Sequence, residues 1–352
     1  MDTKARQELQ IDLKMISNDN SITDEKLQLI TGQILVGQAI LLAYKLGLFK
    51  CLSNGPKSLD ELVLSMNLSE RSIQSLISCA AALDFVKFNS GKYSLSLIGN
   101  KYLNENKTEY YGSVLDLLIE QNEIMSLSSV ERAILQNTPQ VDNGIDIFSD
   151  RMGLGNTNKF VSALHHKAFA PAFHWPTLLN LNPYKKLVDI GGGSGIHTIA
   201  ACKFNSSLRG LVCDRKPVLE HSNAYIDAFQ LNDRVSTTEI DLWEGDYFPE
   251  GDICFFGDIF HDWDPGKCLV LAKKCFNTLP KDGLIILHEM LFNEQKTGPF
   301  LTSAYNLKMM LWTEGQQFSF SELKTILKKT GFYKIRKIKS LGNWSIVIGE
   351  KP

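Results

Sequence analysis

The cysteines of this chain lack the spacing of a disulfide framework or a zinc site. The chain has seven, an odd number, and none forms a Cys-x-x-Cys pair. Small secreted scaffolds and structural zinc sites both need closely spaced or paired cysteines. We therefore expect free thiols in a reducing compartment. Several histidines (165, 166, 174 and 288) also show no metal-ligand spacing, and we predict no metal site. The cysteines are Cys51, Cys79, Cys202, Cys213, Cys254, Cys268 and Cys275.

An excess of charge of one sign is also lacking. The 352 residues include 37 Lys and Arg against 39 Asp and Glu, a net charge of -2. Binders of nucleic acid or of a membrane surface usually carry a basic face, so we expect no partner of either kind. Residues 1–15 are polar, without the apolar core of a signal peptide. We also find no run that approaches the ~20 apolar residues of a membrane span. We expect a soluble, cytoplasmic protein.

The first hundred or so residues follow the order of a winged-helix unit. An apolar-periodic stretch over 24–49 predicts buried helices. Ser58 and Ser69 each precede an acidic, apolar-periodic turn, which predicts two helix starts. The pattern around 89–91 predicts a hairpin. Because Arg71 is the only basic residue of the second of these helices, we expect a dimerisation or scaffold role rather than DNA binding.

The pattern changes at Lys186, after a largely helical region. From there the strand-like runs KLVDI, LRGLVCD, DICFFGDI and GLIILHEML alternate with helical stretches. This alternation predicts an α/β fold with a Rossmann-like, doubly wound parallel sheet, closed by an antiparallel strand pair at the C-terminus. We predict three segments: a winged-helix dimerisation domain over 1–105, a helical linker over 106–180, and the Rossmann-like domain over 181–352.

A glycine-rich turn follows the first strand of the predicted sheet. Leu187-Val188-Asp189-Ile190 leads into GGGSG and then a helix, and glycine allows a ligand to lie against the main chain. Asp189 would repel a pyrophosphate at this helix N-terminus but suits a cationic ligand. Asp214 ends the next strand, 23 positions after Gly191, where an acid binds the ribose of a nucleoside. The same spacing occurs in dinucleotide enzymes, which remain an alternative.

The order of three motifs resembles a known family. The runs GGGSG, CDRKPVLEHS and FFGDIFHDWDPGKCLVLAKKC, in this order, resemble the small-molecule O-methyltransferases that use S-adenosyl-L-methionine. The resemblance covers essentially the whole chain, and FHDWD is its most specific part. It implies a homodimer with S-adenosyl-L-methionine as cofactor and a small-molecule acceptor. It also implies that the cofactor contacts Asp189, Gly191, Gly193 and Gly195 at its methionine end, Asp214 at the ribose, Asp241 and Leu242 at the adenine, and Asp258 in the loop beside it.

The resemblance also assigns the catalytic residues. A lone histidine at a strand end is often structural, but in this family the histidine of the HDW motif, His261 here, is the general base. Asp262 shapes its hydrogen bonds, and Glu289 is the acid that orients it. The family's second acid falls at Gln317, which carries no charge, while Glu314 is out of register. This departure weakens the case for base-assisted transfer to a phenol and leaves other chemistries open.

By the same resemblance, the acceptor lies between the linker helices and those that follow Glu289. Aromatic and methionine side chains there suit a flat, apolar acceptor, although the same residues also suit a core. We expect methyl transfer to a hydroxyl of a small, aromatic secondary metabolite. The alternatives are a C- or N-methyltransferase, a cofactor-retaining enzyme of another reaction type, and a winged-helix regulator that senses the cofactor. The expected acceptor contacts are His166, Phe169, Met309, Met310 and Trp312.

Overall fold

The computed structural model describes residues 23–141 and 154–352. The chain divides into two compact units, 1–100 and 101–352, and each is described by itself. The prediction made for residues 1–15 lies outside the described residues. The division differs from the three predicted segments, because the region 106–180 falls within the second unit. The predicted boundaries at 105 and 180 therefore remain predictions.

The first unit contains the predicted helices and hairpin. Ser58 accepts the backbone N–H of Glu61, whose carboxylate accepts the N–H of Ser58, and this capping box starts α4. Ser69 caps α5 in the same way through the N–H of Ser72. Each cap satisfies a backbone donor that the first helical turn leaves free. The elements are α2 (Glu25–Lys45), α3 (Leu48–Ser53), α4 (Leu59–Met66), α5 (Glu70–Ala82), β1 (Val86–Asn89) and β2 (Lys92–Leu95), with β1 and β2 antiparallel.

Helix α2 corrects one expectation from the sequence. It has 21 residues, and by length and composition it is apolar enough to cross a membrane, although we expected no such stretch. The buried core helix of a soluble protein and a signal sequence also meet this criterion. Only Ile40 and Ala43 of α2 are buried, so the prediction of buried helices over 24–49 is wrong for α2. Its exposed apolar side chains are Leu27, Leu29, Ile30, Ile34, Leu35 and Leu42.

The second unit contains a seven-stranded sheet in the order β5-β4-β3-β6-β7-β9-β8. The first five strands of this order are parallel, and β9 runs antiparallel to both β7 and β8. Every residue of β7 is buried, as expected for a central strand covered on both faces. The strands are β3 (Lys186–Ile190), β4 (Arg209–Asp214), β5 (Val235–Glu239), β6 (Ile253–Gly257), β7 (Leu284–Met290), β8 (Tyr333–Lys339) and β9 (Trp344–Glu350).

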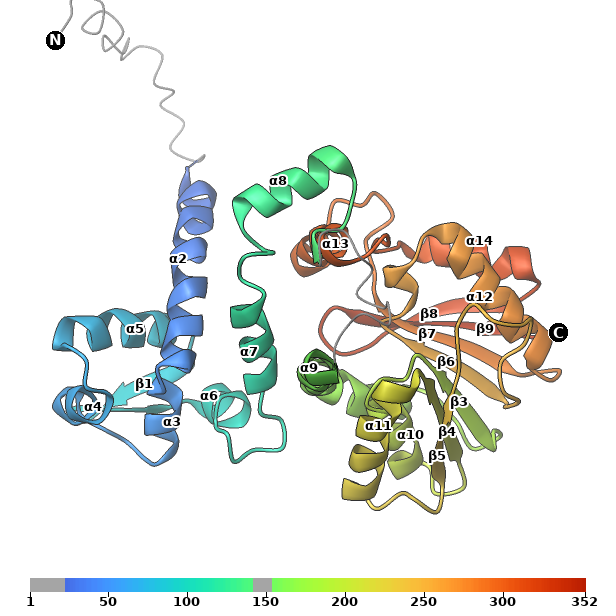
Figure 1. The fold of residues 1–352 in the computed structure, drawn as a ribbon, viewed down its shortest axis with the longest axis horizontal. Helices are drawn as coiled ribbons and strands as arrows, with labels where there is room; N and C mark the ends of the chain where they lie inside the picture. The colour runs from blue at the N-terminus through green and yellow to red at the C-terminus, as the bar shows by residue number, and fades with distance from the viewer. Residues whose placement is uncertain (1–22, 142–153) are drawn as a thin grey trace, which may run out of the picture. The chain divides into compact units, whose positions relative to one another are not determined.

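Helices cover both faces of this sheet. One face packs against α12 (Pro265–Thr278) and α14 (Phe320–Thr330), and the other against α10 (Ile196–Phe204) and α11 (Lys216–Ala228), as Figure 1 shows. The predicted Rossmann-like, doubly wound sheet with an antiparallel edge is therefore confirmed. In such sheets, ligands bind where the order of strands reverses, at the carboxyl ends of the strands. Here that point lies between β3 and β6.

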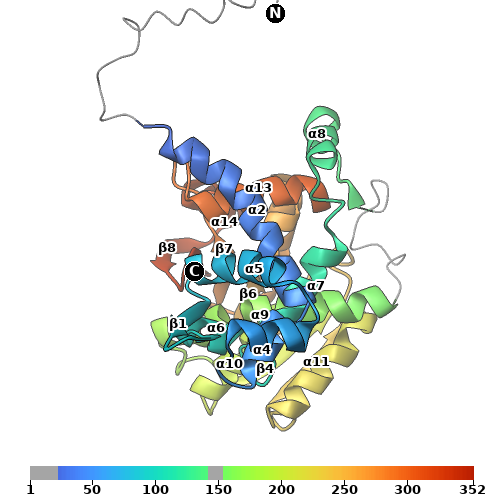
Figure 2. The same ribbon diagram turned by 90° about the vertical axis from the view of Figure 1, so that its left-hand side faces the viewer.

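From α7 onward, the helices that precede the sheet belong to the same unit, while α6 spans the division at residue 100. Helix α9 packs against α10 and α11, and both views place it on their side of the sheet (Figures 1 and 2). Helix α13 packs against α8. The remaining helices are α6 (Leu97–Tyr102), α7 (Gly112–Glu120), α8 (Leu127–Gln136), α9 (Leu154–His174), the short η3 (Trp175–Leu178) and η4 (Phe260–Asp262), and α13 (Phe300–Trp312).

Candidate active site

The glycine-rich turn forms a backbone cradle between β3 and α10. Gly191 and Gly193 have φ angles of +68° and +57°, which side chains with a Cβ rarely adopt. A Cβ added to Gly193 would meet no atom within 4 Å, so this backbone faces open space. Gly191, Gly193 and Ser194 all line a cavity of about 520 Å³. The turn therefore exposes main chain to whatever the cavity binds.

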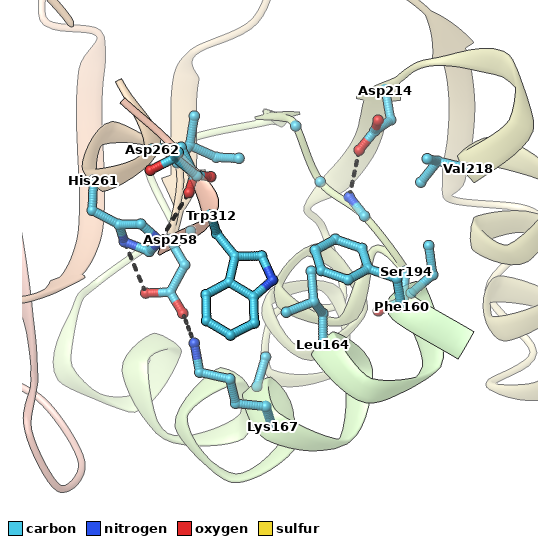
Figure 3. Close-up of a pocket in the computed structure, with 18 of the residues that line it drawn as sticks. Phe160, Leu164, Lys167, Ser194, Asp214, Val218, Asp258, His261, Asp262 and Trp312 are labelled. Atoms are coloured by element: carbon cyan, nitrogen blue, oxygen red, sulfur yellow. Dashed lines mark hydrogen bonds and ion pairs between the residues drawn. The ribbon is translucent and has the colours of Figure 1, made fainter. Parts of the chain in front are cut away.

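Asp214 connects the end of β4 to this cradle. Its Oδ2 atom accepts the N–H of Gly193 at 2.8 Å, and Oδ1 accepts the N–H of Arg215, also at 2.8 Å. Burial raises the pKa of this carboxyl above its usual range. Asp214 lines the cavity, as do Asp241, Leu242 and Asp258 among the predicted cofactor contacts. Figure 3 places Asp214 across the cavity from His261.

Two predicted cofactor contacts do not line the cavity. Asp189 is 1% exposed, and its Oδ2 accepts the hydroxyl of Thr198 in α10 at 2.8 Å. Burial raises the pKa of Asp189 to about 7. Gly195 has a φ of +74° and begins α10, where a Cβ would lie 3.0 Å from Val212. Both residues therefore contact α10 rather than the cavity. Asp189 binds the helix through Thr198, and Gly195 is its N-cap residue.

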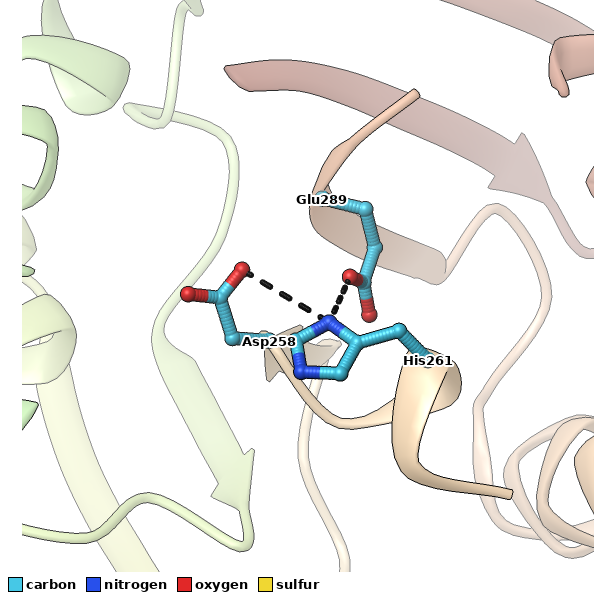
Figure 4. Close-up of side chains that lie close together, drawn as sticks. All are labelled: Asp258, His261 and Glu289. Carbon is cyan, nitrogen blue, oxygen red and sulfur yellow. Dashed lines mark hydrogen bonds and ion pairs between the residues drawn. The ribbon is translucent and has the colours of Figure 1, made fainter. Parts of the chain in front are cut away.

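His261 and Glu289 form the closest ion pair of the site. His261 lies in η4, after β6, and its Nδ1 is 2.6 Å from Oε2 of Glu289 at the end of β7 (Figure 4). The other carboxylate oxygen, Oε1, accepts the backbone N–H groups of Ile259 and Phe260 at 3.1 and 2.8 Å. Glu289 therefore holds both the imidazole and the turn that carries it, which leaves Nε2 as the second ring nitrogen available to a ligand.

Acidic neighbours determine the protonation of His261. Burial by itself lowers the pKa of this imidazole, but the carboxylates of Glu289 and Asp262 outweigh burial and raise the pKa to about 9. Asp262 has Oδ1 at 3.5 Å from Nε2 of His261. Burial raises the pKa of Asp262 itself to about 7. In this state His261 therefore carries a proton at neutral pH, and its base form becomes populated as the pH rises.

Lys167 is a site residue that the sequence analysis missed. Its Nζ lies 3.1 Å from Oδ2 of Asp258 and 2.5 Å from the Tyr305 hydroxyl, and it lines the cavity. The second oxygen of Asp258 accepts the indole N–H of Trp344 at 3.0 Å. Burial raises the pKa of Asp258, but Lys167 and His261 outweigh burial and hold it well below the usual range. A lysine within the apolar, aromatic helix α9 was the signal available in the sequence.

Asp258, His261 and Glu289 also have the composition of a metal site. One donor atom from each lies within 4.8 Å of the others (Figure 4). However, both carboxylates already have partners. Asp258 binds the Lys167 ammonium and the Trp344 indole, and Glu289 binds the His261 imidazole. A dication here would have to displace these groups. The prediction of no metal site remains a prediction.

The predicted acceptor contacts divide into two groups. Met309 and Trp312 of α13 line the cavity, together with Tyr305 and Lys308. His166, Phe169 and Met310 do not line it. The imidazole of His166 instead lies 2.8 Å from both the Ser113 hydroxyl and the Ser162 carbonyl. Phe169 packs with Phe173 and Phe229, and Met310 lies beside Met309 on a different side of its helix. Helical spacing therefore keeps these three residues out of the cavity lining, and their contact with the acceptor stays a prediction.

Gln317 stands where the resemblance places a second acid. It is fully buried, and neither its amide oxygen nor its amide nitrogen has a hydrogen-bond partner among the described residues. Two residues earlier, a Cβ on Gly315 would lie 2.0 Å from the His261 carbonyl, so this loop packs directly against the turn that carries His261. A neutral amide at this position carries no negative charge.

The fold is a doubly wound α/β sheet with a cavity at the carboxyl ends of its strands, where sheets of this kind bind nucleotide-like ligands. Residues 146–333 match the family model described as the O-methyltransferase domain, and the chain belongs to this family. It is an S-adenosylmethionine-dependent O-methyltransferase. The open backbone at Gly193, the carboxylate of Asp214 and the size of the cavity fit this cofactor.

The chain is similar to several proteins along most of its length. It is 24% identical over 320 residues to 3-hydroxy-5-methyl-1-naphthoate 3-O-methyltransferase of Streptomyces sahachiroi, over 89% of this chain and 91% of that one. It is 23% identical to acetylserotonin O-methyltransferase of Bos taurus, over 90% and 94% of the two chains. Human N-acetylserotonin methyltransferase, solved with its cofactor, superposes with a TM-score of 0.81 at 21% identity, over 96% of this chain and 99% of that one.

Proposed function

We propose that this enzyme methylates a hydroxyl group on a small, fused aromatic acceptor, with His261 as the general base. The observation that carries this proposal is the ion pair between His261 and Glu289, in which Nδ1 lies 2.6 Å from the carboxylate Oε2. Because Nδ1 donates to Glu289, Nε2 is the nitrogen that accepts a proton. His261 also lines the cavity that holds the glycine cradle.

The residues of the site have distinct tasks in this reaction. When bound, S-adenosylmethionine supplies an electrophilic methyl group. The cradle at Gly191 and Gly193 and the carboxylate of Asp214 bind and orient the cofactor. Nε2 of His261 takes the proton of the acceptor hydroxyl, and Glu289 stabilises the imidazolium that results. Met309 and Trp312 hold the acceptor ring and exclude water. Positioning of this kind lowers the barrier by restricting the motion of the two reactants.

The names of two relatives support an aromatic acceptor. A naphthoate and acetylserotonin are both fused bicyclic aromatic compounds with an oxygen substituent, and both belong to enzymes that this chain resembles at 23–24% identity. The cavity wall from α13 offers Tyr305, Met309 and Trp312, which suit a flat ring. We therefore infer a bicyclic acceptor rather than an aliphatic one, in the context of secondary metabolism.

We also propose that the first unit is a winged-helix dimerisation domain of a cytoplasmic enzyme. The exposed apolar side chains along α2 favour burial against a second copy, because such a long apolar surface is costly in water. Light scattering should give the mass of two chains, and Ile34→Glu should lower it. A single-chain mass for the unaltered protein, or partition of α2 into lipid vesicles, would contradict this proposal.

Product analysis tests the reaction. The enzyme is incubated with methyl-labelled S-adenosylmethionine and a panel of hydroxylated naphthalenes and indoles, and the products are identified by mass spectrometry. We expect the label on oxygen. A label on carbon or nitrogen would show that the enzyme transfers methyl groups but would overturn O-methylation. No labelled product, despite measurable cofactor binding, would favour a reaction of another type on the same fold.

The pH dependence of turnover tests the base. Methyl transfer should rise as the pH approaches about 9, because the pKa of His261 is about 9 and only its unprotonated form accepts a proton. Glu289→Gln removes the charge that stabilises the imidazolium, so the rising limb should move to lower pH while the maximum rate falls. A limb that stays in place in Glu289→Gln would assign the titration to another group.

A further inference from the structure

The cavity contains a second lysine, Lys308, on α13. Its side chain lines the cavity, and Nζ lies 4.8 Å from the ring centroid of Trp312 and 5.5 Å from that of Tyr305. These residues are four positions after and three before Lys308, which places all three on one face of the helix. The ammonium therefore lies beside the aromatic side chains that we assign to the acceptor.

The two cavity lysines differ in their partners. Lys167 is paired with the carboxylate of Asp258 and bonded to the hydroxyl of Tyr305. By contrast, the ammonium of Lys308 forms no ion pair or hydrogen bond with any residue in the described part of the chain. A partly buried lysine without a counter-ion is costly, and a lysine of this kind in a cavity is a candidate for binding a ligand of opposite charge.

The surroundings of Lys308 agree with a missing anion. Burial lowers its pKa to about 8, and the Lys167 ammonium on α9 acts in the same direction. The carboxylates of Asp262 and Asp258, after β6, act in the opposite direction without reversing the shift. An anion beside Nζ would offset this loss and favour the charged lysine. Because Asp258 and Asp262 lie in the same cavity, a group with a single negative charge suits it better than a dianion.

We propose that Lys308 binds a carboxylate on the acceptor, so that the enzyme selects hydroxylated aromatic acids over their neutral analogues. This inference rests on the proposed function, because it concerns the acceptor half of the same cavity. Lys308 acts as a specificity residue, while the proton of the hydroxyl goes to His261. An ammonium–carboxylate hydrogen bond in a partly buried site is strong enough to change affinity by roughly tenfold or more.

A matched pair of ligands tests this inference. Binding of 6-hydroxy-2-naphthoate and of its primary amide is measured by calorimetry, with S-adenosylhomocysteine present. The two ligands have nearly the same shape and differ in charge. The full-length protein should bind the acid roughly tenfold or more tightly than the amide. Lys308→Met should abolish this preference by weakening acid binding alone, whereas Lys308→Arg should retain most of it.

Lys324 provides a control. It is an exposed lysine on α14, also beside an aromatic ring, with Nζ 5.7 Å from the Phe320 centroid, and it does not line the cavity. Lys324→Met should leave both affinities unchanged. Thermal unfolding checks that each variant is folded. If Lys308→Met does not fold, Lys308→Arg still tests the inference. Equal binding of acid and amide by the unaltered protein, no binding of either, or an equal loss of both in Lys308→Met would overturn the inference.

Methyl transfer to both ligands is measured in parallel, which separates the two proposals. If the acid preference depends on Lys308 but neither ligand is methylated, the inference about Lys308 holds and the proposed reaction fails. If the amide is methylated and the acid has no advantage, the reaction holds and the carboxylate assignment fails.

Discussion

The two ends of the cavity are built in different ways. The end that we propose binds the cofactor consists of the turn after β3, the end of β4 and the loop after β5, and its glycine backbone is open to the cavity at Gly193. The end that we propose binds the acceptor consists of side chains from α9, η4 and α13, which are far apart in the sequence (Figure 3). At the first end, the order of the strands positions the protein groups that line the cavity. At the second end, helix packing does so.

This difference has a consequence for specificity. A backbone cradle recognises a constant part of the ligand, since it changes little when side chains change. The acceptor end can change its preference through single side chains, such as Met309 or Lys308, without altering the sheet. The same fold can therefore keep one cofactor and take many acceptors. The predictions below test whether the two ends act separately.

The largest effect is expected from His261→Ala. Loss of the general base should lower kcat by about 10²- to 10⁴-fold. Cofactor affinity, measured by calorimetry, should stay within about twofold, because the cradle and Asp214 lie at the other end of the cavity. Turnover that survives this change would remove the base role. A parallel loss of cofactor binding would show that the two ends are coupled.

Asp214→Ala should act at the cofactor end. It removes the acceptor of the Gly193 N–H and the group assigned to the ribose, so cofactor affinity should fall by roughly 10- to 100-fold. At saturating cofactor, the KM for the acceptor should hardly change. Unchanged affinity by calorimetry would exclude the ribose assignment. The exposed Asp233, which lies outside the cavity, offers a control as Asp233→Ala.

Met309 and Met310 provide a smaller and sharper test. These neighbours share chemistry, but Met309 lines the cavity and Met310 does not. Met309→Ala should raise the acceptor KM by roughly 5- to 50-fold through lost apolar contact. Met310→Ala should leave that KM near its original value, as should His166→Ala. Equal effects at both methionines would mean that the acceptor reaches beyond the cavity described here.

The smallest effect is expected from Gln317→Leu. The buried amide has no hydrogen-bond partner among the described residues, so an apolar side chain of similar size should leave the free energy of unfolding unchanged or raise it by about 1 kcal/mol. Thermal unfolding measures this change. Gln317→Glu should lower stability, because it buries a charge. A clear loss of stability in Gln317→Leu would mean that the amide does have a partner.

Much of the fold follows from local sequence. Ser58 and Ser69 begin helices where a capping hydroxyl is expected, and the hairpin forms around the residues 90 and 91, of which both have positive φ. The strands from Lys186 onwards alternate with helices as predicted. These features depend on interactions between residues a few positions apart, which a sequence displays directly. The length and apolar composition of α2 are also visible in the sequence, although we predicted no membrane span there.

The glycine-rich turn and the strand ends around it were predictable for the same reason. The glycines, Asp214, Asp241 and Leu242 lie at strand ends, and parallel strands bring those ends to one edge whatever the detailed packing. Gly195 does not line the cavity, and neither does Asp189. The Asp189 side chain accepts a hydrogen bond from Thr198 and does not face the cavity. The twist of the strand and the position of α10 decide where a side chain at the end of a strand points.

By itself, then, the sequence determined the order of elements, the sheet and the location of the glycine-rich turn, all of which arise from short-range patterns. Tertiary structure alone decided the acceptor end. Which of Met309 and Met310 reaches the cavity, why His166 turns to Ser113, and how Lys167 pairs with Asp258, 91 positions away, depend on how α9 and α13 pack. Both helices are apolar on several sides, so their sequences do not specify a single inward face. Packing against the rest of the unit chooses that face.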